Sequence, residues 1–205
     1  MLVYFQRKIN SMSVKHILLS SVAFAICAAS QAQVIWNEAV NGDLSGNRLA
    51  PTTLALGLGN NNLIASMGGS DKEYVHFTLA PGMSLTSIFL TGYVSNDEFS
   101  FIGFQAGSTM TEDPLTANPA NLLGYALFGG SADIGVDLLA RMQAQTGTIG
   151  FTAPLTGSDY TFWIQQTGDA TDYTLNFTTV PEPTTIAAIG FGLAVLAKRR
   201  RKSAK

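Results

Sequence analysis

The chain has 205 residues, of which 46% are hydrophobic, and a formal net charge of -2. This length supports one hydrophobic core, so one domain plus processing segments is expected. Residues 33–180 hold only three basic residues (Arg48, Lys72 and Arg141) against thirteen acidic ones, a net charge of -10. So acidic a domain is repelled by a phosphate backbone, which argues against nucleic acid as a partner. The remaining basic residues lie at the two ends, where they indicate membrane topology signals.

The first 32 residues have the pattern of a signal peptide. Arg7, Lys8 and Lys15 precede an apolar run at residues 17–29, which is expected to enter the translocation machinery as a signal helix. Small residues then suit signal peptidase, so cleavage is predicted between Ala32 and Gln33. Met12 is an alternative start that leaves the mature protein unchanged.

Cys27 is the only cysteine, and it lies inside the apolar run. A lipoprotein anchor requires a small residue immediately before the cysteine, whereas Ile26 is large. The mature domain is therefore expected to lack disulfides, metal thiolates and thiol nucleophiles.

Period-two alternation predicts strands in the middle of the chain, since alternate side chains of a strand face a core. The clearest strands are residues 73–79, 159–166 and 172–178, with inward residues Val75, Phe77, Leu79, Tyr160, Phe162, Ile164, Tyr173, Leu175 and Phe177. Weaker candidates are residues 85–94, 98–105 and 148–151.

Turn-forming clusters separate these strands, at residues 60–62, 68–71, 80–82, 95–97, 157–159 and 167–169. Their spacing predicts an all-β fold, an antiparallel, jelly-roll-like β-sandwich at residues 33–179. One helix is expected at residues 133–143, capped by Ser131 or Asp133.

Residues 37–177 also resemble a PPC-like (pre-peptidase C-terminal) β-sandwich module. The resemblance rests on Gly42-Asp43-Leu44, the strand at 71–79 followed by Pro81-Gly82, and two closing strands with Tyr160 and Tyr173. Such modules are generally accessory domains without catalytic activity, which is what the resemblance implies here.

Candidate catalytic and metal-binding residues are sparse, and no catalytic residue is predicted. His76 is the only histidine of the mature domain, and with no cysteine it cannot complete a zinc site. Calcium is a possible cofactor, through Asp133 with Asp137, or through Asp169 and Asp172 with residues 60–62. A glycosidase would need two facing acids, whereas Asp97-Glu98 and Glu112-Asp113 are sequence neighbours.

Trp163 is the candidate sugar contact. The alternation places its side chain outward, where an exposed indole can stack on a sugar ring. The alternative is that it packs beneath a loop or a second sheet, as large aromatic side chains usually do.

The C-terminal residues 180–205 form a sorting and anchor segment. An apolar stretch at 184–197 predicts a short transmembrane helix, and a basic stop-transfer cluster follows it (Lys198, Arg199, Arg200, Arg201 and Lys202). Immediately before the stretch stand Pro181, Glu182 and Pro183, where the prolines keep the backbone extended.

This order resembles the PEP-CTERM sorting signal of exported Gram-negative proteins. The resemblance implies that a membrane exosortase recognises Pro181, Glu182 and Pro183, often in bacteria that make exopolysaccharide and biofilm. An ordinary single-span anchor is the alternative. The expected protein is therefore a non-catalytic surface or matrix protein, held transiently in the inner membrane and then displayed or released, with exopolysaccharide as a candidate partner. A carbohydrate-binding module and, third, a secreted glycoside hydrolase are the alternatives.

Overall fold

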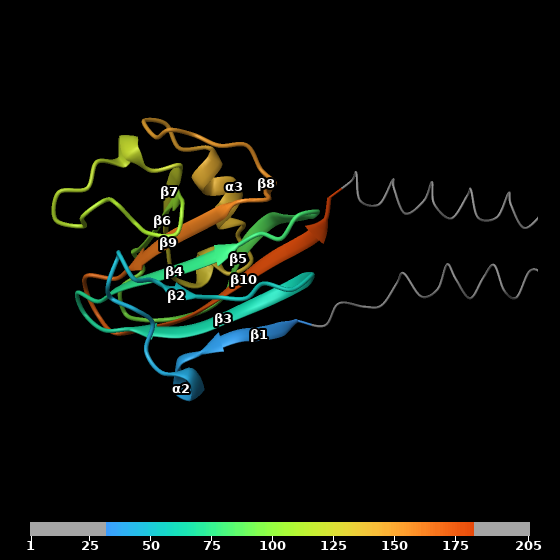
Figure 1. Ribbon diagram of the computed structural model, residues 1–205. Helices are drawn as coiled ribbons and strands as arrows, with labels where there is room; N and C mark the ends of the chain where they lie inside the picture. The colour runs from blue at the N-terminus through green and yellow to red at the C-terminus, as the bar shows by residue number, and fades with distance from the viewer. Residues whose placement is uncertain (1–31, 183–205) are drawn as a thin grey trace, which may run out of the picture. The chain divides into compact units, whose positions relative to one another are not determined.

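The computed structural model describes residues 32–182, which all belong to one compact unit of the chain (Figure 1). The predicted signal helix, the C-terminal transmembrane helix, Pro183 and the basic cluster at 198–202 lie outside the described residues. Within residues 32–182, no helix is long and apolar enough to cross a membrane.

Two five-stranded sheets make up the domain. In spatial order, the first sheet contains β1 (Gln33–Asn37), β3 (Gly59–Met67), β10 (Thr171–Pro181), β5 (Met83–Val94) and β8 (Leu155–Thr156). The second contains β2 (Thr52–Thr53), β4 (Lys72–Thr78), β9 (Asp159–Gln165), β6 (Ser100–Ala106) and β7 (Gly124–Phe128). The helices are short: α2 (Glu38–Asn41), α3 (Leu138–Gln143) and the 3-10 turns Pro119–Asn121 and Ser131–Asp133.

The prediction of an all-β fold is confirmed, and the chain alternates between the two sheets from β3 to β10, apart from the β6–β7 hairpin. The expectation of purely antiparallel strands is wrong at two edges, where β1 pairs with β3 and β2 with β4 in parallel. Both edge strands come from the N-terminal part of the domain. They follow no hairpin turn, so nothing requires them to run antiparallel to their neighbours.

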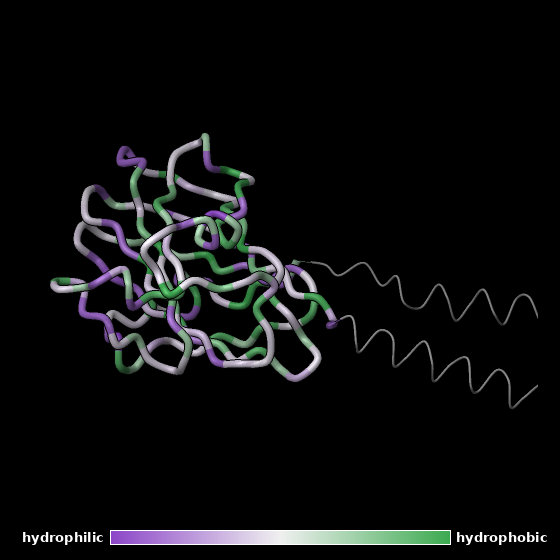
Figure 2. Tube along the Cα trace, turned by 90° about the horizontal axis from the view of Figure 1, so that it is seen from above, coloured by the Kyte–Doolittle hydropathy of each residue, from purple (hydrophilic) through white to green (hydrophobic). Residues whose placement is uncertain are grey.

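One hydrophobic core lies between the sheets. Phe177 of β10 packs edge-on against Phe77 of β4 and Phe162 of β9, with ring centroids 5.7 and 6.1 Å away. All nine residues predicted to face inward are buried. Figure 2 shows the hydrophobic segments of the trace gathered mostly toward the middle of the domain and the hydrophilic segments mostly toward its periphery.

Three local predictions are wrong. Residues 60–62 belong to β3 and not to a turn, because the buried Asn61 amide is satisfied by the backbone of Gly57, Gly59 and Phe177. Residues 148–151 form no strand: Ile149 and Gly150 donate to carbonyls of the segment before β7, and β8 begins only at Leu155.

The third correction concerns the helix, which starts at Leu138 and not at Asp133. Gly135 has φ +85°, a conformation that no α-helix contains. The cap is Asp137, whose Oδ1 accepts from Leu139 N at 3.0 Å and from Ile88 N at 3.0 Å. The second bond fixes the helix to β5, which explains why the cap lies here.

Both ends of the described chain lie at the same end of the first sheet. Gln33 of β1 is opposite Asn61 of β3, and Thr178 of β10 is opposite Asn60. Figure 1 shows β1 entering and β10 leaving the domain on one side. The other end of this sheet, at Met67 and Thr171, therefore lies away from both sites of predicted processing.

Candidate functional site

The sorting signal begins inside a core strand. Strand β10 lies between β3 and β5 and continues to Pro181, two residues past the predicted domain boundary at 179. Thr179 is buried and its hydroxyl donates to the carbonyl of Gly57 at 2.5 Å. Glu182 N then donates to Gly82 O at 2.8 Å, in the turn before β5. No linker separates the fold from Pro181 and Glu182.

Trp163 lies on the outer face of the second sheet, as the alternation predicts, but it is only 6% exposed. Its ring contacts Phe101 with centroids 4.6 Å apart and Tyr74 with centroids 6.5 Å apart. Met110 and Leu122, from the β6–β7 loop, complete this small outer core. Trp163 therefore offers no exposed platform for a sugar ring, and burial beneath a loop, the other interpretation of the sequence, describes this residue.

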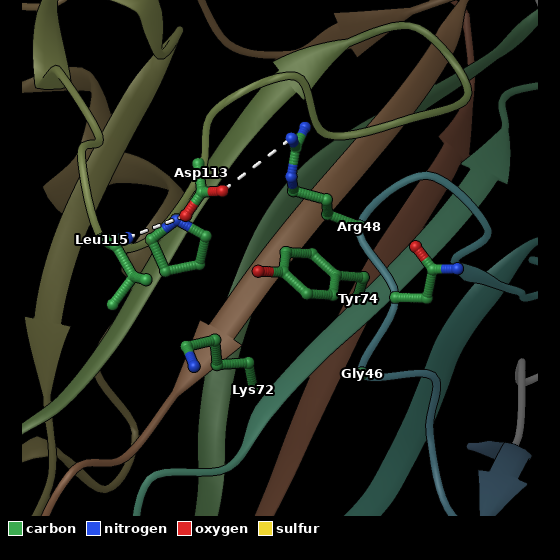
Figure 3. A pocket seen from close by; sticks show the side chains of 8 residues that line it. Gly46, Arg48, Lys72, Tyr74, Asp113 and Leu115 are labelled. Atoms are coloured by element: carbon green, nitrogen blue, oxygen red, sulfur yellow. Dashed lines mark hydrogen bonds and ion pairs between the residues drawn. The ribbon is translucent and has the colours of Figure 1, made fainter.

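An open pocket of about 380 Å³ lies beside this covered face (Figure 3). Lys72 and Tyr74 reach it from one face of β4, and Arg48 and Asp113 reach it from two loops. Arg48 donates to the carbonyls of Met110 and Thr111 at 3.2 and 2.8 Å, and its guanidinium lies 3.9 Å from Asp113. Burial raises the pKa of Tyr74 to about 12, so its hydroxyl is protonated at neutral pH.

The acid cluster, comprising Glu38, Asp43 and Glu73, lies at the end of the first sheet opposite Pro181. One carboxylate oxygen from each residue lies within 4.8 Å of the other two. Glu38 Oε2 accepts from Ser66 N at 2.6 Å, and its Oε1 accepts from Leu44 N at 2.9 Å. Within residues 32–182, the acid cluster is the one place where three or more histidine, cysteine, aspartate or glutamate side chains lie close enough to hold a metal ion.

Glu73 is fully buried between the sheets, where the Tyr173 hydroxyl donates to its Oε2. Burial raises the pKa of Glu73 to about 9; the Tyr173 bond lowers it in part, and nearby Glu38, Asp71 and Asp43 raise it further. Burial likewise raises the pKa of Tyr173, with the Glu73 charge adding to the effect. In the absence of a bound cation, the neutral carboxylic acid is the favoured form of Glu73 at pH 7.

The acids considered for calcium by sequence serve other structural roles. Asp133 forms a bidentate ion pair with Arg141, at 2.6 and 2.9 Å, which lowers the pKa of its carboxyl. Asp137 caps α3. Asp169 and Asp172 are exposed, while Asn61 and Asn62 bond to other residues of the first sheet.

Three of the acids considered for a glycosidase accept hydrogen bonds within loops. Glu112 accepts from Asn118 N and Asn121 Nδ2, while Asp97 accepts from Phe99 N and Asp113 from Leu115 N. His76 lies on the outer face of β4, 3.2 Å from the Asp159 carboxylate, which also accepts from Thr78. The Thr78 bond, then the His76 contact, lowers the pKa of Asp159.

Sequence reasoning missed the acid cluster. The sequence did contain a signal for it: Glu73 alternates in register with Val75 and Phe77 along the strand, so its side chain must also face the core. A glutamate at an inward position requires a compensating partner. Nothing local indicates that Glu38 and Asp43, about thirty residues earlier, lie beside it.

Comparison with protein families defines the end of this chain as a C-terminal protein-sorting signal. The matching family is the PEP-CTERM protein-sorting motif, at residues 179–202, so the predicted resemblance is confirmed. The motif identifies an exported protein, transiently anchored in the membrane and processed there by an exosortase. No curated protein and no solved structure matches the chain, and the PPC-like resemblance gains no support.

Proposed function

We propose that the mature protein is a non-catalytic β-domain, displayed at the cell surface or released into an extracellular matrix once its sorting tail is removed. The observation that carries this proposal is the direct continuity between β10 and the motif. The strand order, with β3 to β10 alternating between the sheets apart from the β6–β7 hairpin, supports a jelly-roll-like classification of the domain.

The junction also limits where the tail is cut. Pro181 is paired with Met83 in the first sheet, and Glu182 N bonds to Gly82 O. A protease binds its substrate in an extended form, free of other strand partners. Cleavage before Glu182 would require the end of β10 to detach, so the proposed cut falls after Glu182.

Intact mass and location in the native host test this function. The expected species begins near Gln33, ends at or just beyond Glu182, and is found outside the cell or on its surface. Glu182→Ala removes the recognition carboxylate but keeps the backbone N–H that bonds to Gly82, so processing should be lost while the melting temperature is unchanged. Glu98→Ala, an exposed acid elsewhere, is the matched control.

A mature species that retains residues 198–205 in the inner membrane, and is indifferent to Glu182→Ala, would contradict the proposal. The tail would then be an anchor only. A mass ending before Glu182 would contradict the proposed cut position while leaving sorting itself supported.

Polysaccharide binding is the second candidate function, favoured by the pocket of Figure 3. Two of the three basic residues of the acidic domain, Arg48 and Lys72, line it beside Tyr74. Such a pocket suits a polysaccharide with carboxylate groups better than a neutral one. Retention of the protein on the host exopolysaccharide should fall in Lys72→Ala and persist in Lys72→Arg; equal retention of both variants would dismiss this pocket.

A further inference from the structure

The acid cluster is built by a short, well-fixed loop at one end of the sandwich. Asn37 caps α2 through a bond to Ala39 N, and Trp36 Nε1 donates to Gly42 O at 3.1 Å. These contacts hold Glu38 and Asp43, which are five residues apart, in one segment against β3. Glu73 arrives from the second sheet, so the cluster joins elements that are distant in sequence.

One buried oxygen of the cluster has no partner among residues 32–182. This atom is Glu73 Oε1, which receives no hydrogen bond from the described residues, although Oε2 of the same carboxylate accepts from Tyr173. A buried polar atom without a partner costs about 1 to 3 kcal/mol, so native structures normally satisfy such an atom. This oxygen belongs to the carboxylate that faces Glu38 and Asp43.

No positive side chain compensates these acids among the described residues. The ion pairs of residues 32–182 join Arg48 to Asp113, His76 to Asp159 and Arg141 to Asp133, and none includes the cluster. Asp71, which lies close enough to affect Glu73 electrostatically, adds a fourth acidic side chain to this region. Asp43 is exposed, and its carboxylate forms no hydrogen bond with any other residue of 32–182.

We propose that Glu38, Asp43 and Glu73 bind a calcium ion. Calcium takes six to eight oxygen ligands at about 2.3 to 2.6 Å, so two of its ligand oxygens lie at most about 5 Å apart. The spacing within 4.8 Å fits this limit. Magnesium demands a near-ideal octahedron at shorter distances, whereas calcium tolerates an irregular set completed by water, which the exposed Asp43 side admits.

The ion would connect the two sheets at the end that the processing sites leave free. Glu38 is bonded to β3 through Ser66, and Glu73 extends from β4 to Tyr173 of β10. Calcium bound here would therefore hold the α2 loop, the first sheet and the second sheet together. Export places the domain outside the cytoplasm, where modules with calcium dissociation constants of about 10⁻⁴ to 10⁻³ M are loaded.

The test uses the full chain purified in detergent and measures its melting temperature with EDTA or with 10 mM CaCl₂. Binding in the affinity range above should raise the melting temperature by about 3 to 10 °C. Terbium, which replaces calcium and is sensitised by nearby aromatic rings, should luminesce through Trp36 and Tyr173 and lose its signal when calcium is added.

Asp43→Asn and Glu73→Gln should abolish both the calcium shift and the terbium signal. Asp43 is exposed, so Asp43→Asn is expected to fold even if Glu73→Gln alters stability. Asp169→Asn, an exposed acid at the same end of the domain, is the matched control and should retain both responses.

Failure of the wild-type chain to show either response would overturn the proposal. A response that survives in Asp43→Asn, or that disappears in Asp169→Asn, would also overturn it by placing the ion elsewhere. Sorting at Glu182 is independent of these outcomes.

Discussion

Glu73→Gln should remove most of the pH dependence of stability between pH 5 and pH 8, measured without calcium. The pKa of Glu73 is about 9 in the folded domain and near 4.5 in the unfolded chain, which exposes it to water. Between these values the folded state holds a proton that the unfolded state has released. Stability is therefore greatest below about pH 4.5 and falls as pH rises toward 9.

The slope follows from the linkage of proton binding to folding. One proton bound only by the folded state gives a loss of about 1.4 kcal/mol in unfolding free energy per pH unit, or about 4 kcal/mol from pH 5 to pH 8. The neutral glutamine keeps an oxygen that accepts from Tyr173 but does not titrate. Asp133 and Asp159, whose pKa values lie below the ordinary range, change protonation below this window.

The free energy of unfolding of the wild type and of Glu73→Gln is measured by urea unfolding in EDTA, at steps of half a pH unit. The wild type should lose stability steadily, while Glu73→Gln should give a nearly flat profile. A flat wild-type profile would refute the reasoning, since Glu73 would then be ionised within the fold. A slope that persists in the variant would assign the titration to another group.

The remaining predictions concern stability and use the urea midpoint. Trp163→Ala should lower the free energy of unfolding by about 3 to 5 kcal/mol, because it removes the central side chain of the small core beneath the β6–β7 loop. Trp163→Phe should lower it less, and unchanged stability in Trp163→Ala would contradict the burial. Asp137→Ala should cost about 1 to 3 kcal/mol by releasing Leu139 N and Ile88 N, with most of the loss recovered in Asp137→Asn. Thr179→Val should cost about 1 kcal/mol, because the carbonyl of Gly57 loses a buried donor; no loss would show that water replaces it.

The Trp163 prediction changes how a sugar-binding experiment should be designed. Trp163→Ala would weaken any ligand binding simply by disturbing the packing around Tyr74, which lines the pocket. Lys72→Ala changes a pocket residue on the surface and avoids this effect.

Much of the fold was predictable because strands leave a local signature. Alternation identified the inward residues of β4, β9 and β10. Side chains along a strand face opposite sides in turn, so the hydrophobic set must be the set that faces the core. The sorting signal was predictable for a related reason. The motif at residues 179–202 is a short linear pattern, so the order of its residues along the chain carries the information.

The main strands, their inward faces and the sorting signal could thus be predicted from the sequence alone, because all of them depend on near neighbours in the chain. Contacts across long separations emerge only in the folded domain: the loop that covers Trp163, the bond from Asp137 to β5, and the approach of Glu38 and Asp43 to Glu73. These contacts arise when the two sheets close on one core. No local pattern encodes them, because the partners are separated by about 30 to 55 residues and are brought together only by the sheet topology.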